Sequence, residues 1–186
     1  MKRRALADVA PQPWRNGGGS TRELLAWPDA AAWQVRVSVA AITRDGDFSA
    51  YPGVDRWFTV LNGDGVALDL PQDRVTLRRG SEPLHFAGEA APACRLLGGA
   101  TQDLNLMIRR GSGRGSMQRA VPGSALQGTA RWRGLYAVEA LTLDCDGTPQ
   151  TLQADTLLWS DADLADWRLP ADTAPAPAWW LLLEAA

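Results

Sequence analysis

Apolar and polar residues alternate with a period of two along most of this chain, and this pattern predicts an all-β fold. In the stretch 33–39, Trp33, Val35, Val37 and Val39 share one face of an expected strand, while Gln34, Arg36 and Ser38 share the other. No helical pattern runs longer than about two turns. Strands separated by turns about every 8 to 12 residues are typical of a sandwich or barrel. Further strands are expected at 56–61, 66–70, 74–77, 84–87, 94–97, 103–108, 131–138, 140–143, 150–152, 156–159 and 179–183.

Turn signals between these stretches predict the connections. Asn62-Gly63-Asp64-Gly65 predicts a hairpin that joins 56–61 to 66–70. Residues 74–77 and 84–87 are expected to form a further strand pair, divided by Gly80 and Ser81. The basic, glycine-rich stretch 109–116 reads as a linker, so we expect two halves, at 1–115 and 116–186.

The composition excludes several classes of function. The formal net charge is −2 and the calculated pI is about 5.4, which gives no general attraction to nucleic acid or to anionic membranes. No signal-peptide pattern or membrane span is seen, so we expect a cytoplasmic protein. Cys94 and Cys145 lie far apart, and both are expected to be reduced, buried thiols. Because His85 is the single histidine, no multi-histidine metal site can form, and no metal or cofactor is assigned.

The segment Pro13–Glu23 combines three consecutive glycines with a dense set of polar groups. The glycines allow close approach of the backbone to a ligand, while the flanking residues offer an aromatic ring, an amide, a hydroxyl, a guanidinium and a carboxylate. The alternative is a surface turn that leads into the first strand. No Gly-Lys-Ser/Thr follows the glycines and no G-x-G-x-x-G spacing is present, so the segment is not a nucleotide-phosphate loop.

Several motifs resemble the HutD/Ves family. They are Trp14-Arg15-Asn16 with Gly19-x-Thr21-Arg22-Glu23, then Phe48-Ser49-x-Tyr51-Pro52-Gly53-Val54-Asp55-Arg56, Phe86-Ala87-Gly88-Glu89, and Asp103-Leu104-Asn105-Leu106-Met107-x-Arg109. The resemblance covers about the first 110 residues, and the last third matches only in general character. It implies a bicupin, with two cupin-like β-barrel or sandwich halves in one chain. It also implies a ligand-binding accessory or regulatory role in bacterial histidine utilisation. This chain lacks the two-histidine-plus-glutamate metal motif of ordinary cupins.

A small barrel points one face of each strand inward, so polar strand faces can line a pocket. We expect such a pocket in the N-terminal half, with the Trp14–Glu23 segment closing over its mouth. Arg22, Arg36 and Arg56 are candidates to hold a carboxylate, because guanidinium groups match carboxylates in a bidentate way. Glu23 and Asp103 are expected to orient these arginines. Asn16, Thr21, Ser38, Ser49 and Asn105 would bind other polar atoms of the ligand, and Trp14, Phe48 and Met107 would pack on its apolar part.

The residues by themselves indicate only a small anionic ligand. The histidine pathway implied by the resemblance adds candidates such as urocanate or an N-formylated acid. We assign no catalytic residue, since the polar set contains no convincing nucleophile and base. An alternative is a metal-independent isomerase or lyase that uses Glu23 or Asp103 as its base. Another is a structural partner protein that uses a tryptophan-rich surface. A homodimer is compatible with the C-terminal Pro177-Ala178-Trp179-Trp180 stretch, but sequence does not separate core from interface.

Overall fold

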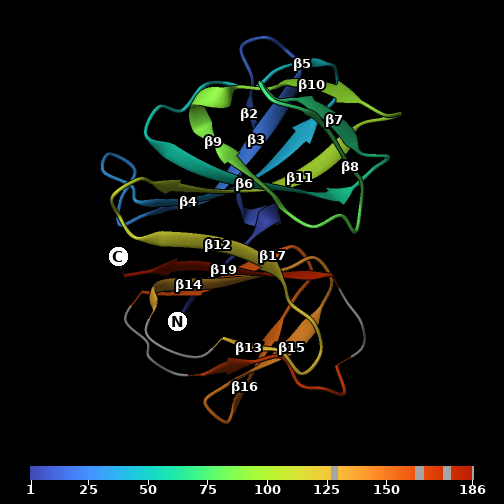
Figure 1. The fold of residues 1–186 in the computed structure, drawn as a ribbon. Helices are drawn as coiled ribbons and strands as arrows, with labels where there is room; N and C mark the ends of the chain where they lie inside the picture. Colours follow the sequence, from blue (N-terminus) through green and yellow to red (C-terminus); the bar gives the residue numbers. More distant parts are fainter. Residues whose placement is uncertain (127–129, 162–165, 174–176, 186) are drawn as a thin grey trace. The chain divides into compact units, whose positions relative to one another are not determined.

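The computed structural model describes residues 1–186 except 127–129, 162–165, 174–176 and 186, and it confirms the all-β prediction (Figure 1). The chain divides into two compact units. The N-terminal unit comprises Val9–Arg110, and the C-terminal unit comprises Met1–Asp8 with Gly111–Ala186. Each unit is built from two antiparallel sheets. The helical segments among the described residues are two short 3-10 turns, η1 (Leu6–Asp8) and η2 (Gly88–Ala90). No described helix has the length and hydropathy of a membrane span.

The N-terminal unit contains a six-stranded and a four-stranded sheet. The larger sheet has the order β2-β3-β4-β11-β6-β9, and its strands are β2 (Gln12–Pro13), β3 (Gly19–Trp27), β4 (Val35–Ile42), β6 (Val54–Asn62), β9 (Leu84–Ala87) and β11 (Thr101–Arg109). The smaller sheet has the order β5-β10-β7-β8, with β5 (Gly46–Asp47), β7 (Val66–Asp69), β8 (Arg74–Leu77) and β10 (Ala93–Leu96).

The core of the N-terminal unit lies between these two sheets. Ile42, Phe58 and Val60 from the larger sheet pack with Val66 and Leu68 from the smaller one, and all five are buried. Burying a side chain of this size stabilises the fold by about 1.5–3 kcal/mol relative to leaving it exposed. Phe58 and Val60 are two positions apart on β6, as are Val66 and Leu68 on β7, so each sheet turns one face toward this core. On β4 the face with Ala40 and Ile42 contributes to the core, not the predicted apolar face with Val35, Val37 and Val39.

The turn at residues 62–65 is present, but the hairpin predicted there is wrong. β6 and β7 meet at this turn, yet β6 pairs with β11 and β9, while β7 pairs with β10 and β8. Gly63 and Gly65 both have positive φ, and Asp64 accepts a hydrogen bond from the Gly99 amide. These features carry the chain across from one sheet to the other. The predicted pair 74–77 with 84–87 fails for the same reason, since β8 and β9 belong to different sheets.

The C-terminal unit repeats this two-sheet plan. Its five-stranded sheet has the order β1-β17-β14-β19-β12, with β1 (Lys2–Ala5), β12 (Arg114–Arg119), β14 (Ala130–Ala137), β17 (Thr156–Ser160) and β19 (Ala178–Glu184). The other sheet has the order β13-β18-β15-β16, with β13 (Ala125–Leu126), β15 (Leu141–Cys145), β16 (Thr148–Leu152) and β18 (Trp167–Arg168). Leu135, Leu143, Trp167 and Trp180 are among the buried residues that pack between the two sheets.

The boundary between the units differs from the sequence-based division at residue 115. The structure places it between Arg110 and Gly111, and Arg114 already begins β12. Residues Met1–Asp8 belong to the C-terminal unit, because β1 pairs with β17 along Lys2–Ala5. This pairing joins residues more than 150 positions apart in sequence, and no local pattern in a four-residue strand specifies so distant a partner.

Candidate ligand-binding site

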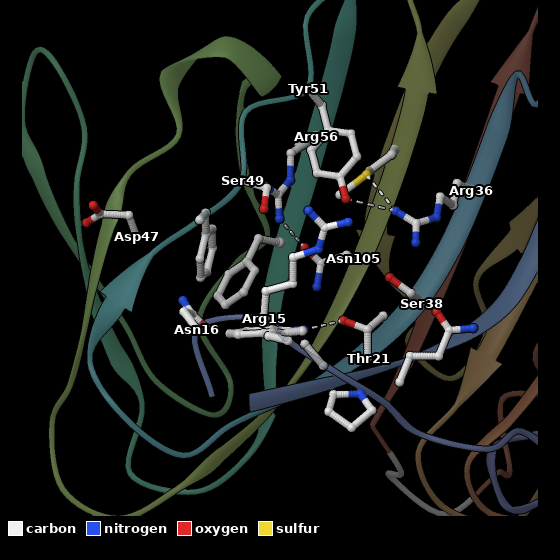
Figure 2. A pocket seen from close by; sticks show the side chains of 17 residues that line it. Arg15, Asn16, Thr21, Arg36, Ser38, Asp47, Ser49, Tyr51, Arg56 and Asn105 are labelled. Atoms are coloured by element: carbon white, nitrogen blue, oxygen red, sulfur yellow. Dashed lines mark hydrogen bonds between the residues drawn. The ribbon is translucent and has the colours of Figure 1, made fainter. Parts of the chain in front are cut away.

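A cavity of about 430 Å³ opens into the N-terminal unit (Figure 2). This volume lies within the range of small-molecule sites. Ten of the thirteen residues predicted to bind ligand line the cavity: Trp14, Asn16, Thr21, Arg36, Ser38, Phe48, Ser49, Arg56, Asn105 and Met107. The remaining lining residues are Gln12, Pro13, Arg15, Ala40, Asp47, Tyr51 and Phe58.

Strand pairing explains why residues so far apart in sequence meet at this cavity. Ser38 on β4 lies opposite Asn105 on β11, and Arg36 lies opposite Met107. Met107 in turn lies opposite Arg56 on β6. Because side chains alternate between the two faces of a strand, residues directly opposite one another project to the same face. Three adjacent strands therefore contribute one continuous polar patch to the inner face of the larger sheet.

Arg36 is held in place by neighbours within the unit. Its Nε donates a 2.6 Å hydrogen bond to Glu23 Oε2, and its Nη1 donates to Tyr51 Oη at 3.2 Å and to the Met107 sulfur at 3.9 Å. Burial by itself would lower the pKa of Arg36, but the hydrogen bonds to Glu23 and Tyr51 raise it above its ordinary value. The charge of this arginine is therefore already paired with a carboxylate.

Arg56 is in a different situation. It is only 5% exposed, and its Nη2 donates a 2.8 Å hydrogen bond to Asn105 Oδ1, which is a neutral acceptor. Its guanidinium carbon lies 5.0 to 5.7 Å from the ring centroids of Phe48, Tyr51 and Phe86. Burial lowers the pKa of Arg56 to about 10, so the side chain still carries its charge at neutral pH. No described carboxylate forms an ion pair with it, and its buried Nε lacks a hydrogen-bond partner within the described part of the chain.

Tyr51 contacts both Arg36 and Arg56, and hydrogen bonds outside the cavity hold its loop in place. Its amide donates to the Gly88 carbonyl at 2.9 Å. Nearby, Glu89 accepts two hydrogen bonds from the Arg110 guanidinium and one from the Gly53 amide. The Arg110 contacts, followed by that of Gly53, lower the pKa of Glu89 to about 2. The loop that carries Tyr51 is thereby tied to the end of β11.

The glycine-rich segment is likewise held by specific hydrogen bonds. Trp14 Nε1 donates to Thr21 Oγ1 at 2.7 Å, which fixes the indole ring along the side of the cavity. The Gly18 amide donates to Asn16 Oδ1 at 2.9 Å, and the Gly18 carbonyl accepts from the Thr43 amide at 2.9 Å. The segment predicted to close over the mouth thus lines one side of the cavity in a defined conformation.

Replacing Gly19 by alanine is expected to destabilise the protein by roughly 1–3 kcal/mol, which is typical of overpacking. A Cβ at this position would lie 2.2 Å from the Ala41 carbonyl oxygen and 3.1 Å from the Trp14 ring, so backbone would have to shift. Gly18→Ala is the matched control, because its Cβ would approach only the Asn16 side chain, at 3.3 Å. Urea unfolding should show the larger loss for Gly19→Ala, and equal losses would contradict this interpretation.

Three predicted residues do not line the cavity. Arg22 lies opposite Val39 in the β3–β4 ladder, and its neighbour Thr21, which points to the other face, lines the cavity. Glu23 orients Arg36, because its Oε2 accepts the hydrogen bond from Arg36 Nε. Asp103 is fully buried, and its Oδ2 accepts from Thr101 Oγ1 at 2.8 Å rather than from an arginine. The expectation that Asp103 orients an arginine therefore has no support in its hydrogen bonding.

Four polar residues that line the cavity are absent from the sequence-based prediction: Gln12, Arg15, Asp47 and Tyr51. Arg15 and Tyr51 belong to the motifs described above, next to residues that are predicted to bind ligand. Figure 2 shows Arg15 pointing from its turn into the cavity and Asp47 with its carboxylate turned away from the arginines. Arg15 and Tyr51 lie outside the strands, and Gln12 and Asp47 lie in two-residue strands. In loops and in strands this short, no alternation rule tells which side chain points inward.

Comparison with known proteins identifies the family. The HutD family model matches residues 6–176, which is most of the chain. The chain belongs to the HutD family.

Two curated relatives agree with this assignment. Protein Ves of Citrobacter koseri is 39% identical over 109 residues, which cover 55% of this chain and 56% of that protein. A 21.2 kDa protein encoded in the hutC 3′ region of Pseudomonas putida is 38% identical over 104 residues, or 54% of each. The chain thus spans about half the length of these curated relatives.

Solved structures of other proteins share the fold of this chain. The structure of HutD from Pseudomonas fluorescens SBW25 superposes with a TM-score of 0.84 at 24% identity, covering 100% of this chain and 98% of the other. A cupin 2 conserved barrel protein from Leptotrichia buccalis superposes with a TM-score of 0.61 at 10% identity, covering 99% and 96%. These similarities establish the cupin fold, and with two such units in one chain the bicupin prediction is confirmed.

The histidine and the two cysteines of this HutD-family chain do not line the cavity. His85 is about half exposed and stacks on Trp57, with ring centroids 4.4 Å apart. Cys94 and Cys145 are buried and form no disulfide, and burial raises the pKa of the Cys94 thiol to about 12. Within the described part of the chain, no cluster of three or more His, Cys, Asp or Glu side chains could hold a metal ion. The candidate site is thus a cavity of arginine, amide, hydroxyl and aromatic groups.

Proposed function

We propose that this HutD-family protein binds a small carboxylate metabolite in the N-terminal cavity, as a non-catalytic accessory or regulatory protein of histidine utilisation. The observation that carries the proposal is Arg56. A buried cation without a carboxylate partner is costly, and such charges in proteins are normally paired. A carboxylate in the cavity would complete the pairing, since a guanidinium offers two parallel N–H donors to it.

The remaining lining residues suit the rest of such a ligand. Trp14, Phe48 and Phe58 offer flat apolar surface, while Ser38 and Ser49 offer hydroxyl groups. A few polar groups set among aromatic rings are typical of sites that bind small molecules with defined orientation. A planar or short-chain acid is the class of ligand that this combination favours.

The family connects this chemistry to a pathway. The P. putida relative is encoded beside hutC, and the solved neighbour from P. fluorescens is named HutD. We therefore propose urocanate or an N-formylated acid as candidate ligands, because each carries a carboxylate together with a second polar group.

The geometry favours binding over the two alternatives. Glu23 and Asp103 are the candidate bases of an isomerase or lyase, and neither lines the cavity. A structural role through a tryptophan-rich surface would need exposed tryptophans. Among the described residues, the exposed large hydrophobic side chains are Met1, Leu97 and Val121. The described tryptophans are buried or partly buried, as expected for core residues.

Thermal unfolding in the presence of histidine-pathway acids tests the proposal. A ligand present at 100 times its Kd should stabilise the protein by about 2.7 kcal/mol. For a chain of this length that corresponds to a rise in Tm of roughly 5–10 °C. Urocanate would be compared with its amide and N-formylglutamate with its diamide, because neither of these controls carries a carboxylate. If no acid raises the Tm above the effect of its amide, the proposal is wrong.

A further inference from the structure

We propose that the cavity takes a dicarboxylate, with one carboxylate at Arg56 and the second at Arg15. This inference rests on the proposed function and names the class of acid that the cavity prefers. Three arginines line the cavity, namely Arg15, Arg36 and Arg56. Arg36 is neutralised by Glu23, so the question is what compensates the other two.

Arg15 and Arg56 are both free of carboxylate partners within the described residues. Arg56 bonds to the neutral Asn105, and Arg15 makes no ion pair or hydrogen bond with any described side chain. Among the described residues that line the cavity, Asp47 alone carries a carboxylate, and this group is turned away from the arginines in Figure 2. Two positive charges therefore face the cavity without a negative charge from the protein to match them.

The two arginines reach the cavity from different elements. Arg56 projects from β6, whereas Arg15 extends from the turn between β2 and β3 and points inward (Figure 2). That turn is held by the Asn16–Gly18 and Trp14–Thr21 hydrogen bonds, so the Arg15 backbone is in a fixed position. Arg15 is exposed at the mouth, while Arg56 is buried.

Two arginines without carboxylate partners, one buried and one exposed at the mouth, favour a ligand with an anionic group for each of them. A carboxylate that forms a bidentate pair with the buried Arg56 uses both of its oxygens there. A second carboxylate on the same molecule would then meet Arg15 near the mouth. The buried pair would supply most of the affinity, because charges at an exposed mouth are screened by solvent. The Arg15 contact would chiefly distinguish diacids from monoacids.

Isothermal titration calorimetry with glutarate, its monoamide and inorganic phosphate tests the inference. Glutarate and the monoamide differ by one charge at nearly constant shape, and phosphate is a compact anion. The wild-type protein should bind glutarate roughly two- to fivefold more tightly than the monoamide. In Arg15→Gln this ratio should fall to about one, with little change in the affinity for the monoamide.

Arg44→Gln is the matched control. Arg44 lies against the same turn, with Nη2 3.6 Å from where a Cβ on Gly17 would be, but it does not line the cavity. The Arg44→Gln variant should retain the wild-type preference for glutarate.

Equal affinities of the wild type for glutarate and its monoamide would overturn the inference and leave the proposed function intact. The inference would also be overturned if phosphate bound as tightly as glutarate, or if Arg15→Gln and Arg44→Gln lost equal affinity for glutarate. Failure of both glutarate and its monoamide to bind, to a protein that urocanate or N-formylglutamate stabilises, would also overturn the inference. Failure of all four acids would contradict the proposed function itself.

Discussion

Replacing Arg56 by methionine is expected to weaken binding of the carboxylate ligand by a factor of roughly 30 to several thousand. This range corresponds to about 2–5 kcal/mol, the usual cost of removing one partner of a buried, hydrogen-bonded charge pair. Methionine preserves much of the side-chain length and can pack against Phe48 and Phe86, so the cavity should keep its shape. The measurement is the Kd of the tightest acid found by thermal unfolding.

Two further variants make this experiment decisive. Arg56→Lys retains the charge but loses the planar fork, and it should bind with intermediate affinity. Arg95→Met removes an exposed arginine of the same unit that pairs with Asp69 at 3.4 Å outside the cavity, and it should bind like the wild type. If Arg56→Met and Arg56→Lys both bind with wild-type affinity, Arg56 does not hold the ligand and the site is misassigned.

Replacing Asp103 by asparagine is expected to stabilise the protein at alkaline pH, by up to about 4 kcal/mol. Asp103 is fully buried, its Oδ1 has no hydrogen-bond partner within the described residues, and it lies opposite the core residues Ala40 and Val60. Burial raises the pKa of this carboxyl from 3.8 to about 7, although the Thr101 hydrogen bond partly opposes the increase. The folded protein therefore keeps the Asp103 proton at pH values where the unfolded chain has lost it.

The sign of the pH dependence follows from this difference in bound protons. Below about pH 4 both states hold the proton, and the contribution to stability is fully present. Between about pH 4 and pH 7 only the folded state holds it, so the free energy of unfolding falls as the pH rises. Asparagine resembles the neutral carboxyl and does not titrate. The difference in stability between Asp103→Asn and the wild type should therefore grow from near zero at pH 4 to its full value above pH 7.

Urea unfolding of both proteins across this pH range provides the measurement, with far-UV circular dichroism as the signal. Asp73→Asn serves as a control, because Asp73 lies in an exposed loop where its Oδ1 accepts from the Arg74 amide, a role that asparagine can also fill. This control should follow the wild-type pH dependence. A constant difference between Asp103→Asn and the wild type at all pH values would show that Asp103 does not titrate in this range.

Which cavity residues could be found from the sequence depended on the kind of element that carries them. On the strands, Arg36, Ser38, Asn105 and Met107 occupy alternate positions, and alternation correctly groups them on one face. The prediction that Arg22 binds the carboxylate is not supported, because Arg22 is next to Thr21 on β3 and its side chain points to the opposite face.

The sequence by itself determined that this chain forms strands, where most of them lie, and which of their side chains share a face. Those properties follow from the two-residue repeat of a strand, which is local. Tertiary structure alone decided which sheet each strand joins, as at the 62–65 turn, where β6 and β7 enter different sheets. It also decided that Arg15 and Tyr51 enter the cavity, and that Glu23 neutralises Arg36 while Arg56 stays without a carboxylate. Pairing and charge compensation depend on neighbours distant in sequence, and no periodic pattern encodes them.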